Sequence, residues 1–440
     1  MPGGSRPSGL RRTLRALDHR NYRLYFGGQG LSLIGTWMTR IAISWLVYRM
    51  THSAILLGVV SFSGQIPTFL LAPFAGVWVD RVNRHRLLKI TQVLSMLESF
   101  ALAGLAFTHI TVAEIIALSA FQGLVNAFDM PGRQSFMVDM VEDRQHLGNA
   151  IALNSSIVNL ARLLGPAIAG IIIAVGSEGV CFLIDGFSYL AVIASLLAMR
   201  ALPRREAPPR QSMIRSLREG WEYVSGFVPA RTLLLLLAAV SLMGMPYAVL
   251  MPIFAGSILG GGAHTYGFIM GAAGCGALVA AVSLAARASV RGLTRVVPIS
   301  AALFGAGLVG FALSRWLWVS LPLIALAGFG MMRQMASTNT ILQTVVPEAK
   351  RGRMMSYYTM AFTGMAPWGS LLMGWLASRI GAPHALLISG ACCLVGAALF
   401  MRRLGAVRQA IRPLYQQLGI VPEMAAGVQA ASQLTTPPEG

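Results

Sequence analysis

Charged residues are scarce in this chain of 440 residues, where Asp, Glu, Lys and Arg together make up only 12%. Soluble globular domains carry about 25% charged residues, which cover their water-exposed surface. Hydrophobic residues make up 55% of the chain. So little charge cannot cover a soluble protein of this length, and the composition therefore predicts an integral membrane protein.

Acidic residues are the scarcer of the two signs, with 16 Asp and Glu against 35 Lys and Arg, which gives a formal net charge of +19. In a soluble protein this excess would indicate a nucleic-acid partner. Here the basic residues fall between long apolar runs and form no patch interleaved with aromatic residues. We therefore predict no nucleic-acid partner and expect the lipid bilayer as the surroundings.

The sequence also lacks the residue patterns of common enzymes and metalloproteins. The four cysteines lie inside apolar segments without a CxxC pair, and the seven histidines show no zinc-ligand spacing. GxxxxGK[ST], HExxH and GxSxG sequences are absent. We predict no cofactor, no metal site and no catalytic residues, so the chain is expected to be neither an enzyme nor an ATP-driven pump.

Long apolar runs are what the chain does have. A helix that crosses a bilayer needs about 20 mostly apolar residues. Twelve segments meet this requirement, namely residues 24–49, 54–78, 87–107, 112–130, 148–174, 179–199, 232–257, 265–286, 294–313, 316–340, 354–378 and 384–401. We predict an all-α integral membrane fold with twelve transmembrane helices.

These segments divide the chain into two pseudo-symmetric six-helix halves. The expected units are a cytoplasmic N-terminal segment, the first half, a central loop, the second half and a tail, at residues 1–23, 24–200, 201–231, 232–401 and 402–440. Gly165-Pro166 in the fifth segment matches Ala366-Pro367 in the eleventh, a weak internal repeat of the kind found in transporters. A short helix near Trp221 is expected to lie on the membrane surface or to be a solvated linker, and the tail is expected to be disordered from Val421.

The positions of the basic residues predict the orientation in the membrane. With the N-terminus in the cytoplasm, 29 of the 35 Lys and Arg fall on the cytoplasmic side and only 3 on the other side. Cytoplasmic loops of membrane proteins carry such an excess. Both termini are therefore predicted to be cytoplasmic, which requires an even number of helices.

The loop after the second segment carries the strongest local pattern, formed by Gly76, Asp80, Arg81 and Arg84. Glycine lets two helices approach closely, and an aspartate at a helix end can pair with an arginine across a cytoplasmic gate. We interpret these residues as a gate that locks one conformation; a generic basic loop is the alternative. Asp129 and Arg133 are expected to form a further gate ion pair.

The pattern of Gly76, Asp80, Arg81 and Arg84 resembles the loop signature of the major facilitator superfamily. Arg162, Gly165, Pro166 and Gly170 resemble the fifth-helix signature that this superfamily associates with antiporters. Four stretches, at residues 45–53, 129–134, 266–267 and 351–356, resemble its bacterial enterobactin-exporter-like branch, also called transmembrane secretion effectors. The resemblance covers residues 17–403. It implies that helices 1, 4, 7 and 10 line a central cavity, that 2, 5, 8 and 11 form the interface of the halves, and that 3, 6, 9 and 12 are outer supports.

Ionisable and polar residues inside the spans are the site candidates, because they are costly to bury in a membrane. The expected substrate cavity consists of Trp37, Arg40, Gln122, Asn126, Tyr247, Arg333, Gln334 and Asn339. Glu98 and Asp185 are the proton-coupling candidates, although structural roles on outer helices are the alternative for both. Related antiporters often carry an acid in helix 1 or 4, where this chain has Thr36.

The resemblance implies a secondary active transporter that exports a small amphiphilic molecule, a siderophore-like metabolite or a drug, by alternating access with proton antiport. The expected location is a bacterial inner membrane, and the expected state is a monomer whose partners are the substrate and protons. Import or facilitated diffusion on the same fold is the alternative. A membrane-embedded enzyme or a sensor is less favoured, because no catalytic groups converge and no loop is long enough for a soluble domain.

Overall fold

The computed structural model describes residues 15–79, 81–141, 144–200, 213–287 and 289–418, and this part of the chain contains helices and no strand. The first part consists of a 3₁₀ turn followed by six long helices. These are η1 (Arg15–Asp18), α2 (Arg20–Thr51), α3 (Ala54–Val79), α4 (Arg84–Phe107), α5 (Val112–Met140), α6 (Arg144–Val175) and α7 (Glu178–Ala198).

The second part begins with a short helix and contains more interruptions than the first. Its elements are α8 (Met213–Gly226), α9 (Val228–Ala239), η2 (Val240–Gly244), α10 (Tyr247–Ile253), η3 (Phe254–Ile258), α11 (Ala263–Ala285), α12 (Leu293–Leu313), α13 (Leu317–Val345), α14 (Glu348–Thr363), α15 (Ala366–Ile380) and α16 (Ala382–Gln417).

Eleven helical segments in the described residues are long and apolar enough to cross a membrane. The all-α, multi-pass membrane fold is thus confirmed. The predicted seventh span is one of the eleven, although π-helical turns η2 and η3 interrupt it at Val228–Ile258. Pro246 and Pro252 lie in this region, and a proline lacks the N–H that would continue the helical hydrogen bonds.

The predicted span 354–378 is not continuous, because the helix breaks into α14 and α15 at Gly364 and Met365. Pro367 stands in the first turn of α15. Its ring would clash with the carbonyl of Thr363 in an unbroken helix, which explains why the break falls there. The two pieces together occupy the place of a twelfth span.

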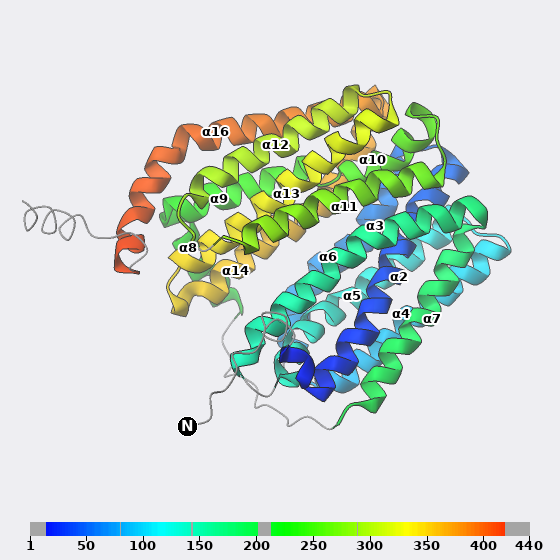
Figure 1. The fold of residues 1–440 in the computed structure, drawn as a ribbon, viewed down its shortest axis with the longest axis horizontal. Coiled ribbons are helices and arrows are strands. Elements are labelled where there is room, and N and C mark those ends of the chain that lie inside the picture. Colours follow the sequence, from blue (N-terminus) through cyan, green and yellow to red (C-terminus); the bar gives the residue numbers. More distant parts are fainter. Residues whose placement is uncertain (1–14, 80, 142–143, 201–212, 288, 419–440) are drawn as a thin grey trace, which may run out of the picture.

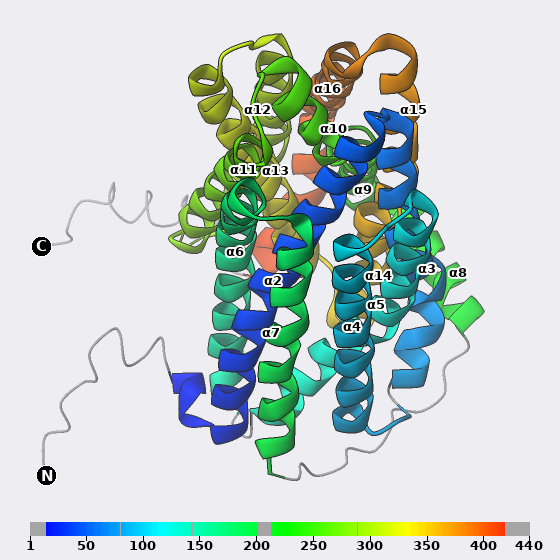
Figure 2. The same ribbon diagram turned by 90° about the vertical axis from the view of Figure 1, so that its right-hand side faces the viewer.

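Two helix bundles stand side by side in Figure 1, one formed by α2–α7 and the other by α9–α16. They are joined mainly where α6 packs on α11 and where α3 packs on α15. Figure 2 shows α6 running up to α11 and α3 lying beside α15 in the turned view. The second and fifth helices of the first half therefore face the eighth and eleventh, as the resemblance implied.

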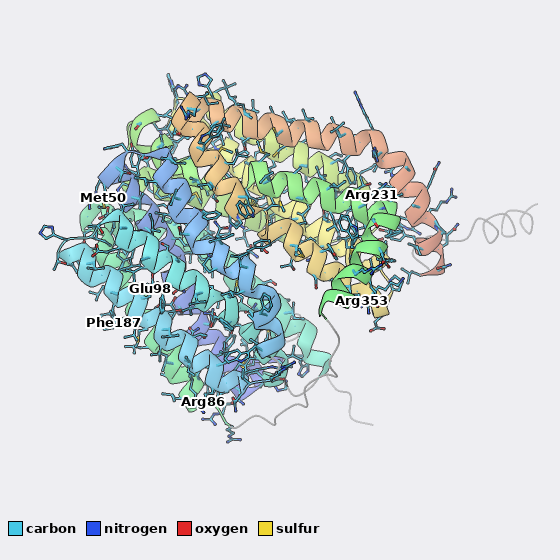
Figure 3. The ribbon with its side chains drawn as sticks, turned by 180° about the vertical axis from the view of Figure 1, so that it is seen from behind. Met50, Arg86, Glu98, Phe187, Arg231 and Arg353 are labelled. Atoms are coloured by element: carbon cyan, nitrogen blue, oxygen red, sulfur yellow. The ribbon has the colours of Figure 1, made fainter. Side chains whose placement is uncertain are left out.

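We name the two ends of the bundle for the rest of the description. The terminal end carries the α3–α4 connection and the two ends of the described chain, and the far end carries the turns at 52–53 and 259–262. Figure 3 places Arg86 at the terminal end and Met50 at the far end of the first bundle, with Glu98 between them.

Glycine contacts hold the two halves together toward the far end. A Cβ added at Gly58 would lie 3.1 Å from Cα of Gly374, and one added at Gly170 would lie 2.9 Å from Cα of Gly267. Tyr48 adds a polar contact there, with its hydroxyl 2.7 Å from Oγ of Ser257. Backbones this close need small residues, so the glycines allow the far end to close.

Helix α8 is attached to the second half rather than free in the central connection. Nη2 of Arg353 lies 2.7 Å from Oε2 of Glu219, and Nζ of Lys350 lies 4.6 Å from the ring centroid of Tyr223. Figure 3 shows Arg353 at the terminal end of this half. Trp221 lies beside Tyr357 of α14, with ring centroids 6.3 Å apart, and is 61% exposed, which suits the predicted position on a membrane surface.

The glycine interface yields a test. Gly170→Leu is expected to lower stability by about 1–3 kcal/mol, because the side chain would collide with the backbone of α11. The thermal unfolding temperature of detergent-purified protein measures this loss. Gly104→Leu is the matched control, since nothing lies within 4 Å of an added Cβ there. Equal unfolding temperatures for the two variants would mean that the halves do not close through Gly170.

Candidate functional site

A cavity of about 370 Å³ lies between the two halves, near the middle of the spans. The first half lines it with many polar side chains, namely Thr36, Trp37, Thr39, Arg40, Ser44, Ser61, Gln65, Glu98, Ser119, Gln122, Asn126, Arg162, Asp185 and Tyr189. The second half contributes mainly apolar and aromatic residues, namely Met245, Pro246, Tyr247, Ala248, Val249, Tyr266, Met270, Ala273, Met331 and Ala366, together with the polar Ser370. All its Arg, Asp and Glu residues therefore come from one half.

Two arginines that line this cavity lie over the ring of one tryptophan. The guanidinium carbon of Arg40 lies 5.1 Å from the ring centroid of Trp37, and that of Arg162 lies 5.7 Å from it. Such cation–π contacts hold the planar guanidinium groups in place without neutralising them. Gly165 makes the arrangement possible, because a Cβ there would come within 2.5 Å of Cβ of Trp37 and push α6 away from α2.

Neither Arg40 nor Arg162 forms an ion pair in the part of the chain that the structure describes. The ion pairs found there involve other arginines, at positions 49, 84, 133, 218 and 353. The wall formed by Trp37 and the two guanidinium groups therefore carries positive charge that the described protein groups leave uncompensated.

Two carboxylates occupy another part of the cavity wall. Glu98 on α4 is 4% exposed and Asp185 on α7 is 1% exposed. Oγ of Ser99 connects them, lying 3.1 Å from Oδ2 of Asp185 and 3.5 Å from Oε2 of Glu98. The hydroxyl of Thr39 donates a further hydrogen bond of 2.8 Å to Oδ2 of Asp185.

Helix α2 contributes to the cationic wall of the cavity and also contacts the carboxylate of Asp185. Trp37 and Arg40 belong to the cationic wall, whereas Thr39 bonds to Asp185 and Thr36 lies 3.4 Å from the hydroxyl of Tyr189. These residues occupy little more than one turn, about 6 Å of helix. A rotation or shift of α2 would thus move the cationic wall and the carboxylate contacts together.

Several predicted site residues line the cavity and several do not. Trp37, Arg40, Gln122, Asn126 and Tyr247 line it. Arg333, Gln334 and Asn339 are not among its lining residues, which differs from our expectation for helix 10. Arg333 stacks over Phe329, Gln334 is 1% exposed inside the second half, and Asn339 accepts a hydrogen bond from Gln343.

Glu98 and Asp185 line the cavity, although they lie on helices that were expected to be outer supports. These are helices 3 and 6, and both carboxylates reach the cavity wall. The reason is that α4 and α7 pack on each other and α7 packs on α2, so short polar contacts carry the carboxylates inward.

The gate residues form pairs inside the first half. Asp129 and Arg133 form an ion pair within α5, and Asp129 also accepts hydrogen bonds from Thr91 at 2.7 Å and Gln92 at 2.8 Å. Nη1 of Arg84 lies 2.8 Å from Oδ2 of Asp139. Asp139 was not predicted from the sequence. Its signal was its place as an acidic residue near the end of α5.

The remaining loop residues give less information. An added Cβ at Gly76 would have no neighbour within 4 Å, and Arg81 is exposed. Asp80 lies outside the described residues, so a pair across the gate stays a prediction for it. In the fifth-helix signature, Arg162 and Pro166 line the cavity and Gly170 belongs to the far-end interface.

The polar hydroxyls around Asp185 were missed by sequence reasoning. Ser99 and Thr39 are 0% and 7% exposed, and both serve the buried carboxylates. For Ser99 the signal was the spacing of Ser95, Glu98 and Ser99, which puts a polar stripe on one face of an otherwise apolar helix.

A multi-pass helical membrane protein with two bundles and a charged cavity between them has the construction of a small-molecule transporter. The model of the transmembrane secretion effector family matches residues 12–415. The chain therefore belongs to this family of major facilitator superfamily transporters, which are not enzymes.

Relatives and solved structures agree with this placement. The chain is 28% identical to the staphyloferrin A transporter of Staphylococcus aureus, covering 87% of this chain and 96% of that one. It is 25% identical to the multidrug efflux pump Tap of Mycolicibacterium fortuitum, covering 86% and 95%. A bacterial homologue of the human lysosomal transporter Spinster, inward-facing and unoccupied, shares the fold with a TM-score of 0.70 at 13% identity, covering 93% and 99%.

The Thr39 contact can be tested on its own. Thr39→Val keeps the shape of the side chain but removes a donor from the buried Asp185 carboxylate, so stability should fall by about 1–3 kcal/mol. Thr359→Val is the matched control, because that hydroxyl is exposed and bonds only within its own helix. Unfolding temperatures of the two purified variants compare the losses, and an unchanged value for Thr39→Val would contradict the proposed role of this bond.

Proposed function

We propose that this transporter exports a small anionic amphiphile by alternating access, coupled to proton antiport. The observation that carries the proposal is the pair of arginines on Trp37, which faces the cavity without a carboxylate partner in the described residues. An anionic group of a substrate would supply the missing negative charge. A cation would be repelled by the same wall.

The part of the cavity wall that the second half forms supports an amphiphilic substrate. Tyr247, Tyr266, Met270 and Met331 of the second half present aromatic and thioether surfaces to the cavity. Methionine and aromatic side chains adapt to bulky apolar groups. A substrate with an anionic part and an apolar body would contact the first half through charge and the second half through packing.

Glu98 and Asp185 are proposed as the proton-binding pair. The two carboxylates share a hydroxyl and have no arginine or lysine paired with them in the described residues. Burying two charged carboxylates in one site costs more than burying one charged and one protonated group. The pair therefore suits a cycle in which a proton arrives at one stage and leaves at another.

Helix α2 is proposed to couple the two events. Its Thr39 bonds to the carboxylate that would gain or lose the proton, and its Arg40 would contact the substrate. A change in the Thr39 contact on protonation would shift Arg40 within the cavity. This arrangement links proton and substrate without placing them on the same atoms.

The direction of transport rests on the relatives and on the basic residues. Relatives include a multidrug efflux pump, which favours export. We place the terminal end in the cytoplasm of a bacterial cell with the chain in the inner membrane, because that end carries most of the basic residues. The far end, where glycines bring the two halves into contact, then faces outward. We expect the protein to work as a monomer.

Proteoliposomes with an imposed pH gradient and an entrapped pH dye test the proposal. The probes are staphyloferrin A, for which one relative is a transporter, and a lipophilic organic anion. Ethidium is the cationic comparison. Anion-dependent proton movement is expected for the wild-type protein. Arg40→Gln and Arg162→Gln should each lower the rate of anion-dependent proton movement roughly tenfold or more, because each variant loses a charged hydrogen-bond donor to the substrate. Arg333→Gln, outside the cavity, should leave it unchanged.

The carboxylate variants separate coupling from substrate binding. Glu98→Gln and Asp185→Asn are expected to abolish proton movement while the anion still binds. Transport of ethidium alone would contradict the anionic substrate. Full activity without both arginines would remove them from the site, and anion flux without proton movement would favour facilitated diffusion over antiport.

A further inference from the structure

A second hollow lies on the outside of the first half and has no part in the proposed transport cycle. It is a groove of about 770 Å³ between α3 and α4, with α5 as its floor. Each helix contributes residues at helical spacing. These are Phe74 and Trp78 on α3, Leu87, Ile90 and Leu94 on α4, and Phe121, Leu124 and Phe128 on α5.

Helix α5 separates this groove from the central cavity. Its residues Phe121, Leu124 and Phe128 face the groove, whereas Gln122 and Asn126 line the cavity on another face of the same helix. The groove is therefore not an opening into the transport site. Its exposed residues, such as Phe74 at 63% and Ile90 at 49%, would face the lipid in a membrane.

The groove changes character along its length. Arg81 lines the groove at the terminal end, and Phe74, seven residues earlier in the chain, lines it further along α3. Helix α3 ends at Val79, five residues after Phe74, which corresponds to roughly 8 Å of helix. No Asp or Glu is among the lining residues in the part of the chain that the structure describes.

We propose that this groove holds an anionic phospholipid of the surrounding leaflet. Its acyl chain would lie along the apolar walls, and its phosphate would face Arg81 at the membrane surface. Lipid tails surround the protein everywhere, so the walls alone give little preference among lipids. The choice of headgroup would come from Arg81, because a basic residue near the surface attracts anionic lipids by about a fivefold factor.

A bound lipid would contact the buried ion pair of the first half through one residue. Thr91 lines the groove, and its hydroxyl donates a 2.7 Å hydrogen bond to Oδ1 of Asp129, the partner of Arg133. Trp78 meets Phe128 edge to face at 5.4 Å across the same groove. Occupancy would therefore brace α3 and α4 against α5 and stabilise this half.

Native mass spectrometry of the full chain in detergent tests the proposal. Phosphatidylglycerol and phosphatidylcholine with identical acyl chains are the probes. The wild-type protein is expected to retain about fivefold more phosphatidylglycerol and to gain a higher unfolding temperature with it. Arg81→Gln should abolish this preference, whereas Arg86→Gln, outside the groove lining, should keep it.

Filling the groove tests the site of the acyl chain. Ile90→Trp is expected to displace both lipids, whereas Leu97→Trp, 54% exposed on the same helix but outside the lining, should not. Leu124→Trp on the floor repeats the test should Ile90→Trp fold poorly. Equal retention of the two lipids by the wild-type protein would overturn the proposal. It would equally fail if the preference survived Arg81→Gln or if the filled groove kept its lipid.

Discussion

The stacking of Arg40 and Arg162 on Trp37 determines the character of the cavity. Charged groups inside a membrane are costly, and such groups persist only where neighbouring protein, water or a ligand compensates them. Here the ring of Trp37 positions the two guanidinium groups, and the described residues supply no carboxylate to neutralise them. The proposed function depends on this unmatched charge, since the charge distinguishes an anionic substrate from the cationic drugs that other transporters carry.

The two halves divide the work unequally despite their similar helix order. All Arg, Asp and Glu residues of the cavity come from the first half, while the second half offers aromatic and methionine side chains. The second half is also the one with broken spans, at η2, at η3 and between α14 and α15. In the proposed function, charge recognition and proton binding would thus reside in a bundle of continuous helices, and the interrupted bundle would supply adaptable surface.

Much of the fold could be predicted from sequence, because an apolar run of about 20 residues has few alternatives to a membrane span. The break before Pro367 could not be placed from hydropathy, since the run looks continuous. Side-chain directions were harder. The rotation of α13 depends on Gly328 and Gly330, which pack against the backbones of α11 and α12. This packing keeps Gln334 inside the half, whereas polar contacts draw Asp185 to the cavity from a helix expected outside.

Equilibrium binding of an anionic ligand at several pH values tests the central claim most directly. Staphyloferrin A or a lipophilic anion would be titrated into purified wild-type protein and into Arg40→Gln/Arg162→Gln and Glu98→Gln/Asp185→Asn double variants. The account predicts that the arginine variant loses affinity at every pH, while the carboxylate variant still binds but no longer responds to pH. Wild-type affinity in the arginine variant, or an unchanged pH response in the carboxylate variant, would contradict it.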